Sequence, residues 1–282
     1  GIFAPGTPYD AKVRGLAAVL EGNQTKAAAV VDGMAQQNDV YVKIGNDQYG
    51  TFSEYSLNFP TIAASNGTLQ SAGFTSGGTA WAPDLAGIQG LSLTSTGHII
   101  VAGGSKASQG QDERYVLRFG LTCSGSSCSG QQMPDGMSLV AAANINSLLG
   151  STTRVGGVAV DLTDNIAYVA EYQTDISSSV TVIPLDLAGN GLSAGTALTI
   201  PLGQAGTEGF DGLAHNSETD NLFGSVGADQ QGNPGFIEFD ITGNPVATHW
   251  TSGDNNGWPT ECCINISGIG MALENNKPIL FA

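Results

Sequence analysis

The stretch Gly157-Val-Ala-Val-Asp-Leu-Thr-Asp-Asn-Ile-Ala-Tyr-Val-Ala-Glu171 holds two short apolar segments separated by a polar turn. Val, Ile and Tyr favour strands, and Asp and Asn favour tight turns, so the pattern predicts a β-hairpin. The same pattern recurs at 90–104, 212–226 and 268–282, and a shorter copy spans 32–45. Because a recurring supersecondary unit indicates a repeat architecture, these copies decide the fold.

A third strand is expected after each of the first four hairpins along the chain, and a weaker fourth strand after most of them. The third strands are expected at 50–59, 115–121, 180–187 and 235–241, and the fourth strands include 197–201 and 245–250. The glycines that begin the copies, at 33, 90, 157, 212 and 268, are 57, 67, 55 and 56 residues apart. Four antiparallel strands in such a period are typical of a propeller blade.

We therefore predict an all-β protein, a single β-propeller domain over residues 1–282 with about five four-stranded blades. The count becomes six if residues 1–32 hold more of a blade. The last copy ends at Ala282, directly after its second strand. We expect the segments 12–20 and 26–31 to complete this last blade, which would close the ring and protect a sheet edge.

The net charge of the chain limits the kinds of partner that it is expected to bind. The chain has 9 Lys and Arg against 25 Asp and Glu, a formal net charge of −16. Such a surface repels phosphate backbones and anionic lipid, so neither nucleic acid nor membrane is an expected partner. The sequence contains no apolar run near the ~20 residues that a membrane helix needs.

Cysteines and glycosylation sequons indicate the secretory route, with a signal peptide already removed. Cys123 and Cys128 are separated by four residues, and Cys262 and Cys263 are adjacent. The even count favours disulfides, for which we prefer the pairs 123–128 and 262–263, with cross-pairing between the two clusters as the alternative. Three Asn-x-Ser/Thr sequons predict glycosylation, at Asn23, Asn66 and Asn265.

In a propeller, the loops before the first strand and those between the second and third strands lie on one face. A small-molecule site typically has apolar walls and a few polar groups. The predicted face carries both apolar and polar side chains. The expected substrate-binding residues are Trp81, Phe210, Trp258, Tyr172, Tyr49, Lys43 and Arg154, and the expected catalytic residues are Asp211, His215 and Glu208. His215 is expected beside the 208–211 loop. Asp161, Asp164 and Asp220 are expected to serve only their local turns.

Two segments, Glu208-Gly-Phe-Asp-Gly-Leu-Ala214 and Gly157-Val-Ala-Val-Asp161, resemble the gluconolactonase-like and NHL-type propellers. Gluconolactonases hold a divalent metal in the channel with Glu, Asn and Asp, so the resemblance implies such a site. Asp211 matches the Asp position, and Glu208 or Glu261 would supply the Glu. The chain departs from the pattern in lacking a matching Asn pair, which puts metal-dependent lactone hydrolysis in doubt.

A second resemblance is to secreted fungal propellers that act as hetero-Diels–Alderases. It implies a cofactor-independent cyclase of secondary metabolism, which positions a small apolar organic substrate by shape and hydrogen bonding. The alternatives are a metal-dependent lactonase with Ca²⁺ or another divalent ion in the channel, and a carbohydrate-binding propeller lectin. The oligomeric state is open, with a homodimer as one alternative.

Overall fold

The computed structural model describes the secondary structure of residues 12–21, 24–32, 39–46, 51–60, 62–63, 65–76, 79–80, 88–94, 96–104, 114–124, 126–127, 135–149, 153–202, 207–226, 235–250, 269–274 and 277–281. Side chains are described for most of these residues between 59 and 248. The described part is all-β, with a single five-residue α-helix, α1 (Gly67–Ser71), and one 3-10 turn at Ala188–Asn190. No helix in it is long and apolar enough to cross a membrane.

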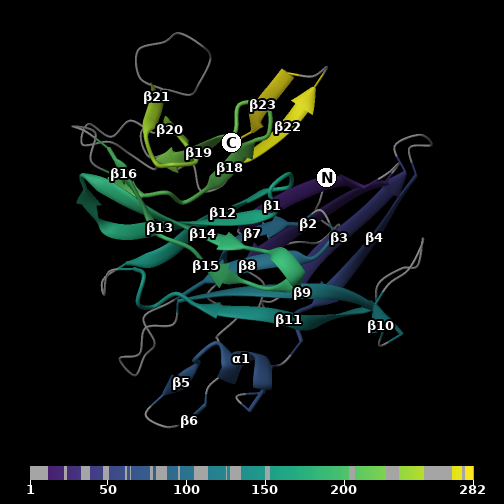
Figure 1. The fold of residues 1–282 in the computed structure, drawn as a ribbon. Helices are drawn as coiled ribbons and strands as arrows, with labels where there is room; N and C mark the ends of the chain where they lie inside the picture. The colour runs from purple at the N-terminus through teal and green to yellow at the C-terminus, as the bar shows by residue number, and fades with distance from the viewer. Residues whose placement is uncertain are drawn as a thin grey trace.

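The strands form antiparallel sheets that follow one another along the chain (Figure 1). The first sheet consists of β1 (Lys12–Glu21), β2 (Gln24–Asp32), β3 (Asp39–Asn46) and β4 (Thr51–Asn58), in that order. The second consists of β7 (Ile88–Leu93), β8 (Ile99–Gly103), β9 (Tyr115–Cys123) and β11 (Gly136–Asn144), with the short β10 (Ser126–Ser127) also on β9. A two-residue pair, β5 (Thr75–Ser76) and β6 (Thr79–Ala80), follows α1.

Two further large sheets and one hairpin complete the fold. The third sheet contains β12 (Arg154–Asp161), β13 (Ile166–Ser177) and β14 (Ser179–Asp186), with β15 (Ser193–Ala194) and β16 (Leu198–Pro201) on β14 and β17 (Thr207–Gly209) on β13. The fourth contains β18 (Leu213–Asn216), β19 (Asn221–Val226), β20 (Gly235–Asp240) and β21 (Pro245–Trp250). The last described pair is β22 (Gly270–Glu274) and β23 (Lys277–Phe281).

The four full copies of the repeat are hairpins, as predicted. They correspond to β7–β8, β12–β13, β18–β19 and β22–β23. The third strands expected after the second, third and fourth sheets' hairpins are β9, β14 and β20, and the expected fourth strands are β16 and β21. The propensity and turn chemistry of the repeat therefore fixed local structure over most of the chain.

The N-terminal strands differ from the prediction. The segments 12–20 and 26–31 were expected to complete the last blade, but β1 and β2 pair with each other, and β2 pairs with β3 in the first sheet. The shorter repeat copy at 32–45 therefore contributes β3, the third strand of its sheet, and 50–59 contributes β4. The physical reason is local: β1, β2, β3 and β4 are neighbours in the chain and pair as a simple meander, which needs no long-range closure.

The first strands of successive sheets pack against each other in chain order, β1 on β7, β7 on β12, β12 on β18 and β18 on β22. Glycines permit this close approach. A Cβ on Gly90 would lie 2.7 Å from the carbonyl oxygen of Gly156, and one on Gly157 would lie 2.3 Å from the backbone nitrogen of Leu213. Gly90, Gly157 and Gly212, three of the recurring glycines, thus lie where neighbouring sheets meet, in a β-propeller-like arrangement.

The core lies between the sheets. In β8, Ile99 and Val101 face one apolar cluster, whereas Ile100 and Ala102 face the next. Alternate residues of a strand point to opposite faces, so a strand covered on both faces is apolar throughout. The cluster between the third and fourth sheets includes Tyr168, Val182, Phe210, Leu222 and Phe239.

Candidate functional site

The end of the third sheet nearest β17 brings together several of the predicted site residues. Arg154 lies opposite Tyr172 in the β12–β13 ladder, and Tyr172 lies opposite Gly209 in the β13–β17 ladder. Arg154 is exposed, and Tyr172 and Asp211 are half-buried. The strand register therefore brings Arg154, Tyr172 and the backbone of Gly209 side by side, and the site role of these residues stays a prediction.

Glu171, which the sequence analysis did not single out, is a buried carboxylate at the same end, with 4% of its surface exposed. The pairing of β13 with β14 ends at Ala170, one residue before Glu171. The Glu171 carbonyl accepts a hydrogen bond from the Phe210 N–H. The Glu171 carboxylate then accepts from the Thr181 N–H at 2.8 Å, which satisfies a donor that the strand ladder has lost. Its position directly before Tyr172 on the strand was the only signal in the sequence.

Phe210 differs from its predicted role as a pocket wall. Its side chain is fully buried and stacks on Phe239 with ring centroids 5.5 Å apart. A Cβ on Gly224 would lie 2.5 Å from the Phe210 ring, so the ring fills the space that this glycine leaves. Phe210 is a core residue that anchors the chain between the third and fourth sheets.

The remaining predicted residues are described in part or not at all. Lys43 lies in β3 and Glu208 in β17, where the structure describes the backbone only. Cys123 is disulfide-bonded, and Asn66 caps α1 by accepting hydrogen bonds from the backbone of Thr68 and Leu69. Outside the described residues lie Tyr49, Trp81, Trp258, Glu261, Cys128, Cys262, Cys263, Asn23 and Asn265. Their roles, the disulfide pairing and the glycosylation stay predictions.

His215 contacts two carboxylates that were expected to serve only their own turns. It was expected beside the 208–211 loop, and its Nε2 lies 3.0 Å from Asp220 Oδ1 and 3.9 Å from Asp161 Oδ2. The side chains of His215 and Asp161 are 4% and 2% exposed, whereas that of Asp220 is 49% exposed. One potential ligand atom from each residue lies within 4.8 Å of the other two. We call Asp161, His215 and Asp220 the inter-sheet cluster.

The cluster joins two turns. Asp161 ends β12 and begins the turn to β13, and its Oδ1 accepts hydrogen bonds from the backbone N–H groups of Thr163 and Asp164. His215 lies on β18, and Asp220 ends the turn to β19 with φ +59°. Asp tolerates this left-handed conformation better than most residues, so the turn itself explains an Asp or Asn there.

Tyr168 packs beside the cluster. Its ring stacks on His215 with centroids 6.4 Å apart. Burial, together with the nearby charges of Asp161, Asp220 and Asp164, raises the pKa of the Tyr168 phenol to about 12. The carboxylates of two separate turns therefore act on one buried region.

Comparison of the repeats position by position carried a signal for this cluster. With Gly157 aligned on Gly212, Asp220 falls at the position of Asn165, and both residues have positive φ. His215 falls at the position of Val160. The copy at 212–226 therefore has a histidine where the copy at 157–171 has an apolar residue, one residue before the end of the first strand of the hairpin. This difference was the signal in the sequence.

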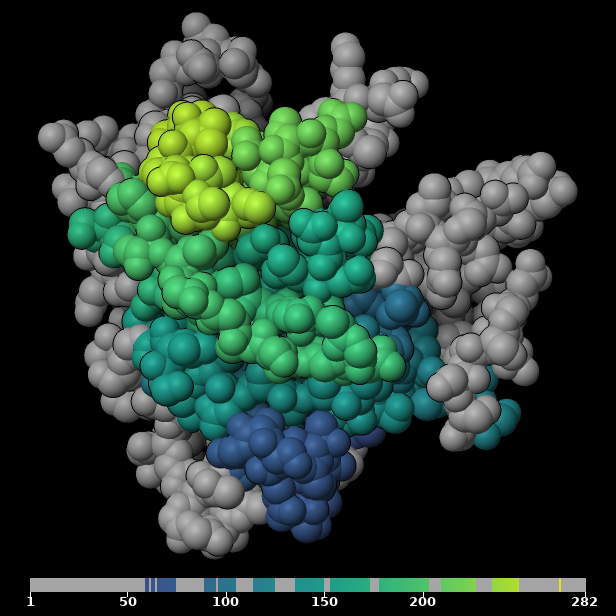
Figure 2. Space-filling view, viewed as in Figure 1, coloured from purple at the N-terminus to yellow at the C-terminus, as the bar shows by residue number. Residues whose placement is uncertain are grey.

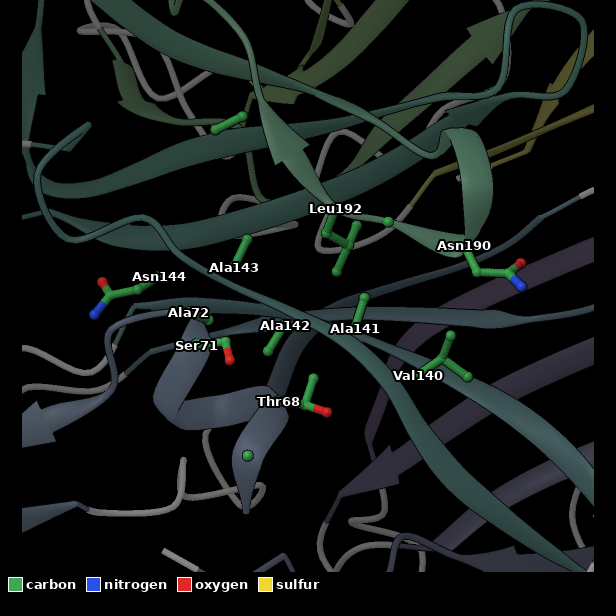
Figure 3. Close-up of a pocket in the computed structure, with 13 residues that line it drawn as sticks. Thr68, Ser71, Ala72, Val140, Ala141, Ala142, Ala143, Asn144, Asn190 and Leu192 are labelled. Atoms are coloured by element: carbon green, nitrogen blue, oxygen red, sulfur yellow. The ribbon is translucent and has the colours of Figure 1, made fainter. Parts of the chain in front are cut away.

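A groove of about 620 Å³ lies elsewhere, on the outer strand of the second sheet (Figure 3). Its lining comes from α1, β11 and the segment 190–194 and consists of small, apolar, hydroxyl and amide side chains, including Thr68, Ala142, Asn144, Asn190 and Leu192. Figure 2 shows the α1 segment in blue beside the teal and green residues of the second and third sheets. The groove lacks ionisable groups among these lining residues and lies apart from the inter-sheet cluster.

Comparisons with known proteins give a distant likeness. No family model matches the chain, and no curated protein matches it. Among solved structures it is similar to a GH43 endo-arabinanase from Bacillus licheniformis, with 15% identity over 93% of this chain and 84% of that one, and a TM-score of 0.41. A putative 6-phosphogluconolactonase from Bacteroides fragilis is 10% identical over 84% of this chain and 71% of that one, with a TM-score of 0.39.

A third similar structure is the hydrazine synthase of Kuenenia stuttgartiensis, 10% identical over 88% of this chain, with a TM-score of 0.40. The chain spans only 52% of that protein, and 28% of a bifunctional GH43-CE protein from Bacteroides eggerthii. At these identities and TM-scores, the likenesses assign no activity to this chain.

Proposed function

We propose that this chain is a secreted small-molecule catalyst on a five-bladed ring of sheets, with its site where Arg154, Tyr172 and Asp211 lie. The register that sets Arg154 opposite Tyr172, and Tyr172 opposite Gly209, carries the proposal. It sets a cation and a phenol opposite each other on adjacent strands, and the Asp211 carboxylate follows the end of β17 by two residues, 57 residues after Arg154 in the sequence.

The proposed chemistry is positioning. Arg154 and Asp211 would hydrogen-bond the polar groups of a small organic substrate, and Tyr172 would enclose its apolar part, with Trp81 and Trp258 expected from the sequence to assist it. Holding two reacting groups in the productive geometry can by itself contribute several kcal/mol to a barrier. A cyclisation or hetero-Diels–Alder-type cycloaddition fits this arrangement, because it needs orientation and hydrogen bonding but no nucleophile.

Binding measurements test the site. We expect an apolar polyene with one carbonyl to bind the wild-type protein in calorimetry. R154A and D211N should each weaken binding by about tenfold, the loss typical of one charged hydrogen bond. The matched control is E218Q, which neutralises an exposed carboxylate in the β18–β19 turn and should bind like the wild type.

Two other outcomes would overturn the proposal. Binding of oligosaccharides alone would identify a lectin. Divalent-ion-dependent hydrolysis of a sugar lactone, lost in D211N, would identify a lactonase, for which Glu208 and Asp211, three residues apart, would be the acidic pair.

A further inference from the structure

The inter-sheet cluster presents one imidazole nitrogen and two carboxylates from two different sheets. His215 Nε2 lies 3.0 Å from Asp220 Oδ1 and 3.9 Å from Asp161 Oδ2. Zinc binds His nitrogen and carboxylate oxygen at about 2.0–2.2 Å in tetrahedral geometry, which separates the ligand atoms by about 3.3 Å. The two observed separations bracket this value, and all three ligand atoms lie within 4.8 Å of one another, so shifts of the side chains would allow them to share one ion.

The Asp161 carboxylate gives a second, independent indication. Both of its backbone hydrogen bonds, from Thr163 and Asp164, go to Oδ1. Oδ2 points to His215 and accepts no hydrogen bond from the part of the chain that the structure describes, although the side chain is 98% buried. The 3.9 Å between Oδ2 and Nε2 is too long for a hydrogen bond, so this oxygen can take a further ligand.

We propose that Asp161, His215 and Asp220 bind a Zn²⁺-type divalent ion that links the third and fourth sheets. The half-exposed Asp220 leaves a route from solvent, and water would supply the fourth ligand. The imidazole and the small number of oxygens favour a transition metal over Ca²⁺, which takes six to eight oxygen ligands.

This ion is separate from the proposed substrate site. Arg154 begins β12 and Asp161 ends it, so the two sites lie about 23 Å apart along the strand at ~3.3 Å per residue. Because the ligands come from two sheets, binding should resist the separation of those sheets and stabilise the folded chain.

The test uses the purified full chain, stripped with a chelator and titrated with Zn²⁺. We expect one Zn²⁺ per chain by calorimetry, and a rise in Tm of about 5 °C at a hundredfold excess over Kd. H215Q and D220N should each weaken binding at least tenfold and abolish the rise in Tm. Asn tolerates the left-handed backbone at position 220, so D220N should keep the turn.

D164N is the matched control, because it removes an equal charge from an exposed residue of the same turn that Asp161 begins. It should bind Zn²⁺ like the wild type. The proposal is wrong if the wild type binds no Zn²⁺, or if D164N weakens binding as much as D220N, since the cluster would then act only as a diffuse negative charge. Binding of Ca²⁺ with no response to Zn²⁺ would also overturn it.

Discussion

At the scale of single residues, Asp240 shows how a turn carboxylate is held by its neighbours. Its Oδ1 accepts hydrogen bonds from the Thr242 hydroxyl at 2.7 Å and from the backbone N–H groups of Thr242 and Asn244 at 2.9 Å each. Oδ2 accepts from the Asn244 side chain at 3.0 Å. The Thr242 hydroxyl and the Asn244 donors hold the pKa of Asp240 well below its usual range.

We expect D240A to lower the free energy of unfolding at pH 7 by about 0.5–1 kcal/mol, because these hydrogen bonds lie at the surface. A folded pKa below the unfolded value stabilises the protein above the unfolded pKa of about 3.9, and this contribution is lost as pH falls toward the folded pKa. The difference between wild type and D240A should therefore stay constant from pH 7 to 5 and shrink below pH 4. Urea titrations across this range measure the difference. D240N keeps one side-chain acceptor in the turn, so a loss of stability in D240N as large as that in D240A would contradict a role for these hydrogen bonds.

At the scale of elements, Arg118 ties β9 of the second sheet to the turn that follows β14 of the third. Its guanidinium donates to the carbonyl oxygens of Leu187 at 2.7 Å and Gly191 at 3.2 Å, and to Asn190 Oδ1 at 3.4 Å. Its Nε donates to His98 Nδ1 at 2.9 Å, so His98 is part of this link. The side chain is 3% exposed, and burial lowers the pKa of Arg118.

We expect R118K to lower the free energy of unfolding by about 2 kcal/mol, because one ammonium group cannot reproduce a planar fork that bonds four acceptors. R154K is the control, since Arg154 is exposed and its replacement should change stability by less than about 0.5 kcal/mol. Chemical unfolding of both variants measures the difference. Equal stability of R118K and wild type would show that the link contributes nothing.

At the scale of the whole molecule, the distance between neighbouring sheets is set at the recurring glycines. The Gly157 N–H donates to the Phe210 carbonyl at 3.0 Å across the boundary of the third and fourth sheets. A Cβ on Gly157 would lie 2.3–2.7 Å from backbone atoms of Gly212 and Leu213, which have no flexible end to move aside. The sheets themselves would have to separate.

We therefore expect G157A to lower the free energy of unfolding by more than about 3 kcal/mol, or to prevent folding. G67A is the control at a glycine whose added Cβ would meet nothing within 4 Å, and Ala favours the helix α1 there. Thermal unfolding of the two variants, or their soluble yield, separates them. A G157A protein as stable as G67A would show that the sheets pack less tightly than the structure has them.

The sequence by itself determined the hairpins, because strand propensity and turn chemistry act over a few residues and recur in each copy. It also placed the glycines that the sheet boundaries require. The alanines at 141–143 favour a helix in isolation, but they lie in β11, which pairs with β9. The helix propensity of these alanines is weaker than the packing and hydrogen bonds gained in the sheet.

Only the tertiary structure decided which strands share a sheet and which side chains meet between sheets. β1 and β2 pair with β3 rather than with the last hairpin, a choice between partners that both present strand-forming faces. Asp161 and His215 are 54 residues apart, and the turn chemistry of Asp161 accounts for only one of its two carboxylate oxygens. The other oxygen lies near His215 of the neighbouring sheet. Local sequence patterns determine the geometry of a turn, but they do not determine which residues pack against it.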